Sequence, residues 1–256
     1  MRRAGWLIES TIRLNASVSY RTRWVSSVGP VSGAWLLRTT AGFALPDASS
    51  WQLFAKGPHS RLFRSSSTNT VLAKFVRPRS HPRDDMRKYG NAQARREFTS
   101  AYRLQSAGLL TPTVHGWGLS LSPFAYYESV LFMEEVPDYR SSLSFIRECD
   151  DHSARAFFLE RLAADMARLH GHALIHKDGH FDNIGWVKQQ SLVWIDNDIR
   201  HAKRPRSLVR GFRHMHRMLR RTARDAIRDM EWRHFNDCLR AELARWPQAR
   251  ILIDEV

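Results

Sequence analysis

Acidic and amide side chains gather in one stretch of an otherwise basic chain, ALIHKDGHFDNIGWVKQQSLVWIDNDIR, residues 173–200. Asp178 and Asn183 share a short polar loop, and Asp196 follows the apolar run SLVWI. Crowded carboxylates repel one another unless a cation lies among them. Oxygen atoms of Asn and Asp suit Mg²⁺, whose shell is usually completed by phosphates and water. A loop followed by a hairpin would bring these oxygens together, so the stretch predicts Asn183 and Asp196 as ligands of Mg²⁺ accompanied by ATP.

Asp178 is then expected to have a separate task, which is to accept or orient the proton of an attacking hydroxyl group. His176 is expected to brace the loop by hydrogen bonds, and His180 either faces the phosphates or completes the loop. No histidine pair here has the HExxH spacing, which disfavours zinc in this stretch. The alternative is a pair of solvated turns with incidental acids, and the apolar run that ends at Asp196 favours the site instead.

Size and composition restrict the class of protein. The chain has 256 residues, 43% of them hydrophobic, which is enough for a folded core. Its formal net charge of +15 predicts attraction to a polyanion, either nucleic acid, an anionic membrane or a phosphorylated glycolipid. No apolar run is long enough to predict a transmembrane helix. Cys149 and Cys238 have no metal-ligand or redox spacing, so we expect small buried side chains in a reducing compartment.

The elements that must position the site change character along the chain. Residues 1–48 are rich in Arg, Ser and Thr, resemble a transit peptide in composition, and are expected to be a basic, poorly ordered extension. WQLFAKG, RLFRSS and TNTVLAKFVRP predict antiparallel strands, and NAQARREFTSAYRLQSAG predicts a helix that ends near Gly108. LLTPTVHGWGLSL and YYESVLFMEEVP predict two further strands. From residue 137 onward the patterns are mainly helical, beginning with DDHSARAFFLERLAADMARLHGHAL.

This order predicts an α+β fold whose domain, residues 49–256, divides into a strand-rich lobe (49–136) and a mainly helical lobe (137–256). Near the C-terminus a helix is expected to begin at Phe212. Its apolar positions are Phe212, Met215, Leu219, Thr222 and Ala226. Its arginines, which are either a solvated face or a surface for phosphates or an anionic glycolipid, are Arg213, Arg217, Arg220, Arg221, Arg224 and Arg228.

The motifs resemble those of protein-kinase-like phosphotransferases. HKDGHFDN is similar to the H-x-D-x-x-x-x-N catalytic loop, and WIDND stands where the metal-binding D-F-G is found, with Asn197 and Asp198 in place of its last two residues. TVLAKFV resembles the V-A-I-K strand, and ARREF offers Glu97 on the next helix. The resemblance implies a two-lobed fold in which Lys74 holds the ATP phosphates and pairs with Glu97, since an unpaired buried ammonium is costly.

The same resemblance assigns the adenine side of the site. LFMEEVP resembles the hinge between lobes, with Met133 behind the adenine and the backbone of Glu134 and Val136 bonded to its edge. KGPHSRLFR stands in the place of the phosphate-covering loop but contains Gly57 alone instead of G-x-G-x-x-G. Phosphate contacts there would depend on the backbone from Gly57 to Ser60.

A narrower resemblance, from about Trp51 to Trp246, is to the lipopolysaccharide kinase (Kdo/WaaP, InaA-like) family. It is carried by ARREFTSAYRLQSAGLLTPTVHGWG, by ESVLFMEEVPDYRSSLSFIRE and by the short catalytic stretch. Membership would imply ATP-dependent phosphorylation of Kdo or heptose in the lipopolysaccharide inner core, at the cytoplasmic face of the inner membrane. No A-P-E segment follows Asp196, which favours a small-molecule or glycolipid acceptor over a protein.

Other hypotheses remain open at this stage. An aminoglycoside-type kinase would need an acidic acceptor pocket, whereas the C-terminal region is rich in arginine. A nucleic-acid-binding module is suggested by the charge, but no nucleic acid is expected because such a module leaves the ordered kinase positions unexplained. A pseudokinase scaffold is disfavoured because every residue type that catalysis requires is present. The role of Asp198 is not decided by the sequence.

Overall fold

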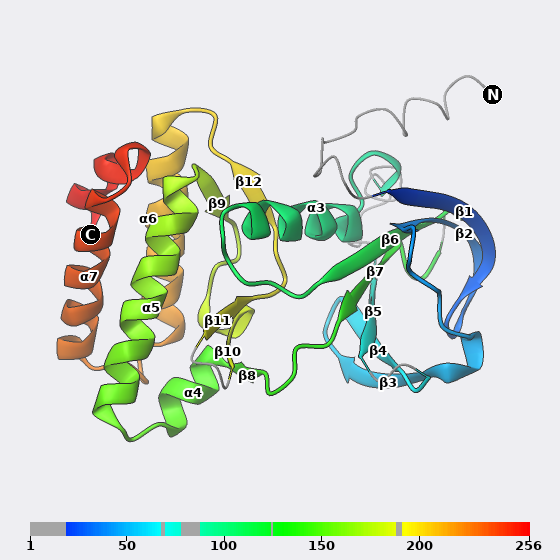
Figure 1. The fold of residues 1–256 in the computed structure, drawn as a ribbon, viewed down its shortest axis with the longest axis horizontal. Coiled ribbons are helices and arrows are strands. Elements are labelled where there is room, and N and C mark those ends of the chain that lie inside the picture. The colour runs from blue at the N-terminus through cyan, green and yellow to red at the C-terminus, as the bar shows by residue number, and fades with distance from the viewer. Residues whose placement is uncertain (1–18, 68–69, 78–87, 124, 188–190) are drawn as a thin grey trace. The chain divides into compact units, whose positions relative to one another are not determined.

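The computed structural model describes residues 19–67, 70–77, 88–123, 125–187 and 191–256 (Figure 1). The chain divides into two compact units, which are Met1–Thr99 with Thr113–Glu135, and Ser100–Pro112 with Val136–Val256. The boundary therefore falls inside helix α3 (Gln93–Ser106) as well as after Glu135. The sequence predicted a single division after residue 136 and did not separate residues 100–112 from the first part.

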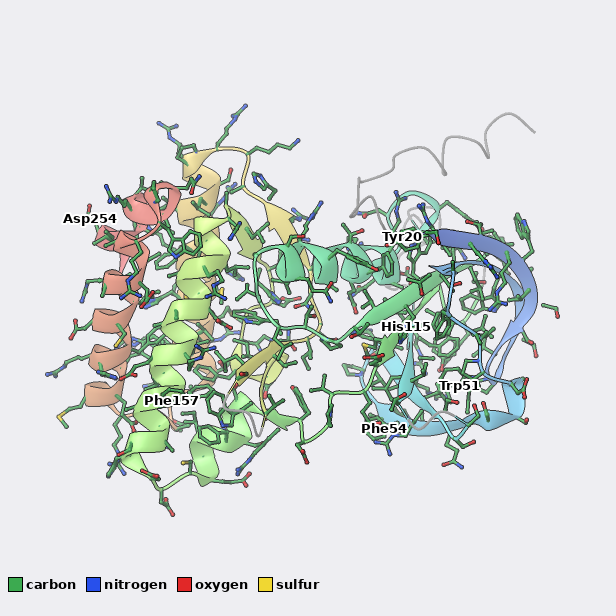
Figure 2. All side chains as sticks on the ribbon, viewed as in Figure 1. Tyr20, Trp51, Phe54, His115, Phe157 and Asp254 are labelled. Atoms are coloured by element: carbon green, nitrogen blue, oxygen red, sulfur yellow. The ribbon has the colours of Figure 1, made fainter. Side chains whose placement is uncertain are left out.

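The first unit is built on a seven-stranded antiparallel sheet in the order β1-β2-β6-β7-β5-β4-β3. The strands are β1 (Tyr20–Val28), β2 (Val31–Thr40), β3 (Trp51–Lys56), β4 (Ser60–Ser65), β5 (Val71–Val76), β6 (Val114–Ser120) and β7 (Ser129–Glu134), with a short 3₁₀ turn, η1 (Ala48–Ser50), before β3. Aromatic side chains, among them Trp35, Phe75 and Phe132, form much of its core. Trp51, labelled in Figure 2, begins β3 and joins this core.

Strands β1 and β2 correct the expectation that residues 1–48 form an extension outside the fold. They pair with each other, and β2 also pairs with β6 in the middle of the sheet. In β2 the buried residues Trp35, Leu37 and Thr39 alternate with more exposed ones, which is the pattern of a strand with one face in a core. The Arg- and Ser-rich composition concealed this alternation. Residues 1–18, the rest of that prediction, lie outside the described residues.

The second unit is mainly helical and carries two small antiparallel sheets, β11-β10-β8 and β12-β9. Its elements are β8 (Arg140–Ser141), α4 (Ser142–Glu148), α5 (His152–Gly171), β9 (Leu174–His176), η2 (Phe181–Asn183), β10 (Ile184–Val187), β11 (Ser191–Trp194), β12 (Ile199–His201), α6 (Pro205–Thr222), α7 (Asp229–Ala244) and η3 (Pro247–Glu255). Their apolar side chains form one core cluster, in which Phe158, Phe212 and Phe235 are fully buried. This continuous core keeps the small sheets fixed against the helices.

Helix α5 is the central scaffold of this unit. It begins at a local cap, because the Asp151 carboxylate accepts the backbone N–H groups of Ser153 at 2.8 Å and Ala154 at 3.3 Å. The apolar positions expected from the sequence are buried, Phe158 and Leu162 among them. Helix α5 runs beside α7 in Figure 1, and Arg155 holds Glu231 of α7 with Nε–Oε1 2.6 Å and Nη2–Oε2 2.7 Å. This two-pronged pair sets the register between the two helices.

Helix α6 begins earlier and ends earlier than the sequence predicted. It starts at Pro205 instead of Phe212, since proline is favoured in the first helical turn, and it ends at Thr222. Ala226 therefore lies beyond the helix. Among the described residues, no helix is long and apolar enough to cross a membrane.

Candidate active site

Lys74 and Glu97 form a buried ion pair within the first unit. Lys74 lies on β5 between Ala73 and Phe75, which point into the core, so its side chain leaves the opposite face of the strand. Its Nζ lies 2.9 Å from Oε2 of Glu97 on α3, and both side chains are only 5% exposed. The pairing that the spacing predicted is therefore present, and it is shielded from water.

The second oxygen of Glu97 is also held. Gln93, one helical turn earlier on α3, donates from Nε2 to Oε1 of Glu97 at 2.9 Å. Because both carboxylate oxygens have partners, the carboxylate has a fixed orientation and the ammonium group of Lys74 is fixed with it. A positioned ammonium group of this kind is suited to bind phosphate oxygens.

Two of the residues expected to contact the nucleotide, Gly57 and Glu134, already use their backbone N–H groups in hydrogen bonds within the protein. Gly57 lies in the turn between β3 and β4, where its N–H donates to the carbonyl of Ser60 at 2.9 Å. Met133 and Glu134 end β7, and the N–H of Glu134 donates to the carbonyl of Thr113 at 2.8 Å. Val136 begins the longer stretch of the second unit. Contacts of these residues with a nucleotide remain predictions, and the engaged N–H groups of Gly57 and Glu134 are not expected to supply them.

The loop that follows β9 wraps around the backbone of Asp178. Asp178 donates its N–H to Nδ1 of His176 at 3.2 Å, and its carbonyl accepts the N–H of His180 at 3.0 Å and Nδ2 of Asn183 at 2.8 Å. The exposed carboxylate of Asp178 is thus presented by a main chain that is held on both sides. The bracing role expected for His176 is confirmed.

The two histidines of the loop have different surroundings. His176 is fully buried, and burial lowers its pKa to about 4 despite the opposing influence of Asn197, Asp178 and Asp198. It is therefore neutral at physiological pH, and because Nδ1 accepts a hydrogen bond, the proton is on Nε2. His180 accepts the N–H of Asp182 on its own Nδ1 at 3.3 Å and so completes the loop.

A β-hairpin brings Asn183 and Asp196 to the same place. Ile184 of β10 pairs with Trp194 of β11, and one step further the N–H of Ile195 donates to the carbonyl of Asn183 at 3.0 Å. Asp196 follows with a φ of +51°, a backbone conformation that is unusual for a residue other than glycine. Such strain is often found at functional positions.

The donor atoms of this pair fit Mg²⁺. Since Nδ2 of Asn183 donates to the carbonyl of Asp178, its Oδ1 is the atom left to bind a cation. Asp196 supplies a carboxylate, so both groups offer hard oxygen atoms. Tyr139 is close enough to feel the charge of Asp196. Burial, together with the charges of Asp196 and Asp182, raises the pKa of Tyr139 to about 12.

Asp198, whose role the sequence left open, is paired with a lysine. Its Oδ2 lies 2.6 Å from Nζ of Lys177, and its carbonyl accepts the Lys177 N–H at 3.2 Å. In the same place β12 pairs with β9, with Ile199 opposite His176. Asp198 therefore holds the start of the catalytic loop against β12.

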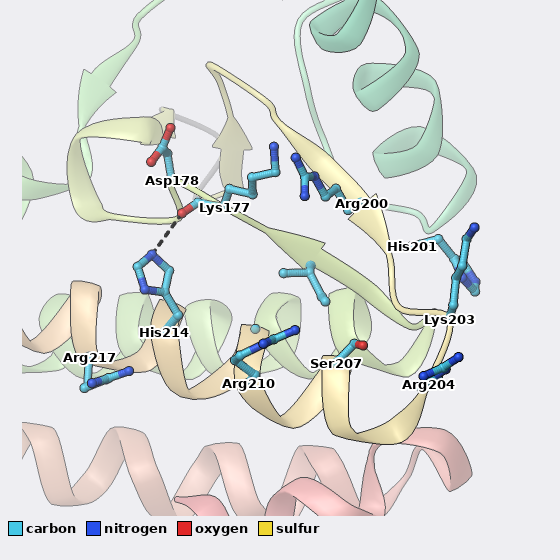
Figure 3. Close-up of a pocket in the computed structure, with 12 residues that line it drawn as sticks. Lys177, Asp178, Arg200, His201, Lys203, Arg204, Ser207, Arg210, His214 and Arg217 are labelled. Atoms are coloured by element: carbon cyan, nitrogen blue, oxygen red, sulfur yellow. Dashed lines mark hydrogen bonds between the residues drawn. The ribbon is translucent and has the colours of Figure 1, made fainter. Parts of the chain in front are cut away.

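A basic pocket of about 970 Å³ opens beside Asp178 (Figure 3). Lys177 and Asp178 of the loop, Arg200 of β12 and Arg210 of α6 border it, and Figure 3 shows Arg200 and Arg210 facing the space from different elements. The remaining lining residues are Ile175, His201, Lys203, Arg204, Ser207, Gly211, His214 and Arg217. Asp178 is the only acid in this lining, so the pocket has a strongly positive potential.

Several pocket arginines are not neutralised by acids. Within the described part of the chain, no salt bridge engages Arg200, Lys203, Arg204 or Arg210. The N-terminus of α6, at Arg204, adds the partial positive charge of the helix dipole. The pocket is therefore suited to an anionic ligand that lies against Asp178.

The sequence did not identify most of this pocket. Of its lining residues, only Asp178 and Arg217 were singled out in advance for a role in binding or catalysis. The segment NDIRHAKR between Asp196 and α6 offered a compositional signal, since it is basic and short. Nothing in it showed that β12 and α6 would direct these side chains to the same space as the catalytic loop.

Comparisons with known proteins identify a family and a similar fold. The family model for the lipopolysaccharide kinase (Kdo/WaaP) family matches residues 79–238. Among solved structures, one described as WaaP in complex with acyl carrier protein matches with a TM-score of 0.54 and 19% sequence identity, over 80% of this chain and 82% of that chain. No curated protein matches the chain. The structural match confirms the predicted α+β, protein-kinase-like fold.

Proposed function

The chain belongs to the lipopolysaccharide kinase (Kdo/WaaP) family, and we propose that it transfers phosphate from ATP, with Mg²⁺, to a Kdo or heptose hydroxyl of the lipopolysaccharide inner core. Family membership makes it a kinase that uses ATP.

On the nucleotide side, Lys74 binds the α- and β-phosphates and Glu97 holds it in place. The 2.9 Å ion pair with 5% exposure supports these roles, because a buried lysine needs such a partner to remain charged. The backbone around Gly57 covers the phosphates, and Met133, Glu134 and Val136 contact the adenine. For Glu134 the carbonyl is the contact group, since its N–H is already engaged.

Asn183 and Asp196 hold the Mg²⁺ ion through Oδ1 and the carboxylate. The ion held there would supply positive charge that offsets the negative charge developing on the transferred phosphoryl group. The hairpin register and the Asn183–Asp178 hydrogen bond of 2.8 Å keep these two ligands beside the catalytic loop without help from the nucleotide.

Asp178 accepts the proton of the acceptor hydroxyl on a carboxylate oxygen as the hydroxyl oxygen attacks the γ-phosphorus atom. The bond from that phosphorus to its bridging oxygen breaks, and ADP leaves with the electron pair. Its backbone, fixed by His176 and Asn183, keeps that oxygen in place. The hydroxyl must lie within hydrogen-bond reach of this carboxylate, so the acceptor has to occupy the space beside Asp178.

The observation that carries the proposal is the pocket in which Asp178 is the only acid among basic residues. Kdo carries a carboxylate, and guanidinium groups bind carboxylates and phosphates in two-pronged geometry. A cationic aminoglycoside would be repelled by the same residues. The glycolipid acceptor in turn implies peripheral contact with the cytoplasmic face of the inner membrane, where exposed Arg220, Arg221 and Arg224 would meet anionic headgroups.

The proposal is tested by phosphate transfer from labelled ATP in the presence of Mg²⁺. Purified lipopolysaccharide inner core, a generic protein and an aminoglycoside are offered in parallel, with Asp178→Asn as the control. We expect label in the core glycolipid alone, and incorporation about 10²- to 10⁴-fold slower with the variant. Label in the protein or the aminoglycoside but not in the glycolipid would overturn the proposed acceptor while leaving the kinase family unaffected.

A further inference from the structure

Three side chains on the outer surface of the α5–α7 pair form a separate cluster that the kinase reaction does not use. They are Glu160 of α5 and His234 and Cys238 of α7, and one potential ligand atom of each lies within 4.8 Å of the others. His234 Nε2 is 3.1 Å from Glu160 Oε1 and 3.8 Å from Cys238 Sγ. A carboxylate, an imidazole and a thiol are the three ligand types that zinc takes in proteins.

The spacing of these atoms fits a metal site. At ordinary zinc–ligand lengths, neighbouring ligand atoms of a tetrahedral site are about 3.3–3.6 Å apart. The observed distances of 3.1 Å and 3.8 Å lie on either side of that range. Small side-chain rotations would therefore bring the three ligand atoms to tetrahedral spacing. His234 and Cys238 are one helical turn apart and therefore share a face of α7.

The two helices hold the ligands in position before any metal binds. The Arg155–Glu231 pair fixes α5 against α7 on one side of the cluster. Further along, Gly171 at the end of α5 is so close to Trp246 that a Cβ at Gly171 would lie 2.3 Å from its ring. The backbones that carry Glu160 and His234 are thus constrained at both ends, which lowers the entropic cost of assembling a site.

Local charge and access also favour a cation. The cluster itself contributes an acidic ligand, because Glu160 supplies a carboxylate oxygen beside His234 and Cys238. The side chains of Glu160 and His234 are 49% and 42% exposed. An ion can enter from solvent, and a water molecule can occupy a fourth position.

We propose that Glu160, His234 and Cys238 bind one zinc ion that links α5 to α7. The three ligands and a bound water give a four-coordinate site. Binding displaces the thiol proton to solvent, so the ion and the two anionic ligands together are neutral. The spacing between Cys149 and Cys238 gives no indication of this site, because the informative spacing is H-x-x-x-C within α7, from His234 to Cys238.

The test uses the metal-stripped full chain and Co²⁺ as a spectroscopic substitute for Zn²⁺. We expect a thiolate-to-cobalt charge-transfer absorption at one equivalent, its disappearance when Zn²⁺ is added, and a higher Tm with Zn²⁺. Cys238→Ser should abolish the absorption. Cys149→Ser is the matched control and should retain it, since Cys149 is the chain's other cysteine and lies outside the cluster.

A second variant separates ligation from a folding defect. Glu160→Gln removes an exposed surface carboxylate, and we expect it to weaken Zn²⁺ binding more than tenfold, because even loss of a partner that orients a ligand typically costs about tenfold or more. No absorption in the wild type, an absorption that persists in Cys238→Ser, or unchanged Zn²⁺ affinity in Glu160→Gln would each overturn the proposal. Kinase activity is not part of any of these measurements.

Discussion

At the scale of single residues, the two aspartates of the catalytic stretch are expected to fail in different ways. Asp196→Asn removes a metal ligand and should abolish the Mg²⁺-dependent thermal stabilisation by ATP. Asp178→Asn should keep that stabilisation and lower kcat by about 10²- to 10⁴-fold, the usual contribution of a general base. Equal stabilisation of wild type and Asp196→Asn by Mg²⁺ and ATP would exclude Asp196 as the ligand.

The buried pair between Lys74 and Glu97 predicts an effect on stability as well as on activity. Glu97→Gln leaves an ammonium group in a site with 5% exposure, and removing one partner of a buried pair typically costs about 3–5 kcal/mol. Denaturant unfolding of Glu97→Gln, Lys74→Met and the double variant measures this cost. We expect the double variant to lose less than the sum of the single losses. Strict additivity would show that the two side chains are not coupled.

The arginines of the pocket should affect the acceptor and not the nucleotide. Hydrogen bonds to charged groups contribute about 1.5–3 kcal/mol, so Arg200→Gln and Arg210→Gln are each expected to raise the KM for the inner-core acceptor about tenfold or more. The KM for ATP should not change. Arg233→Gln, at an exposed position of α7 outside the pocket, is the matched control. A rise in the ATP KM instead would place the nucleotide in this pocket.

At the scale of elements, the contact between α6 and β9 shapes the floor of the pocket. A Cβ at Gly211 of α6 would lie 2.5 Å from Cγ2 of Ile175, which is closer than real atoms approach. Gly211→Ala should therefore push α6 away from β9 and destabilise the chain by about 1–3 kcal/mol, as overpacking does, and this exceeds the gain of at most about 1 kcal/mol from helix propensity.

The experiment compares the free energies of unfolding of Gly211→Ala and Gly42→Ala. Gly42 has no heavy atom within 4 Å of its potential Cβ, so the same substitution should have little effect there. A displaced α6 also carries Arg210 away from the catalytic loop, so we expect a higher acceptor KM for Gly211→Ala. A stabilised Gly211→Ala variant would mean that the two elements are not closely packed.

Elements were predictable from the sequence where local patterns matched their environment. The strand of Lys74 and the helix of Glu97 were anticipated because alternation and capping residues act over a few positions, as Gly108 does with its φ of +72°. Strands β1 and β2 were missed since Arg, Ser and Thr occupy their exposed positions and suggest a leader. The start of α6 was misplaced because its first turn is polar and faces the pocket.

The site itself was predictable only in part, because some of its residues are close together in the sequence and others are far apart. Asp178, Asn183 and Asp196 lie within one loop and hairpin, so their spacing carries the information. The pocket combines the catalytic loop, β12 and α6, and the orientation of these elements is decided by core packing. The zinc ligands come from two helices, and only the His234–Cys238 part of that site is visible in one of them.

At the scale of the whole molecule, buried histidines link stability to pH. His170 and His176 are fully buried and burial lowers the pKa of each from 6.5 to about 4. His170 Nδ1 donates to the carbonyl of Leu174 at 3.0 Å, and both rings fit their sites as neutral groups. Above pH 6.5 these two imidazoles are neutral in both the folded and the unfolded chain. They therefore contribute no pH dependence to the free energy of unfolding in that range.

Between pH 6.5 and pH 4 the unfolded chain takes up protons that the folded chain does not, so stability must fall as the pH is lowered. A shift of this size corresponds to about 3 kcal/mol for each histidine once the pH is near 4. We expect the Tm to decline across this range, and to decline less in His170→Gln, because glutamine can still donate to the Leu174 carbonyl and does not titrate. His59→Gln, at an exposed position, should follow the wild type. If His170→Gln and the wild type lost Tm in parallel from pH 6.5 to pH 4, the buried imidazole of His170 would not be the group that makes the fold acid-labile.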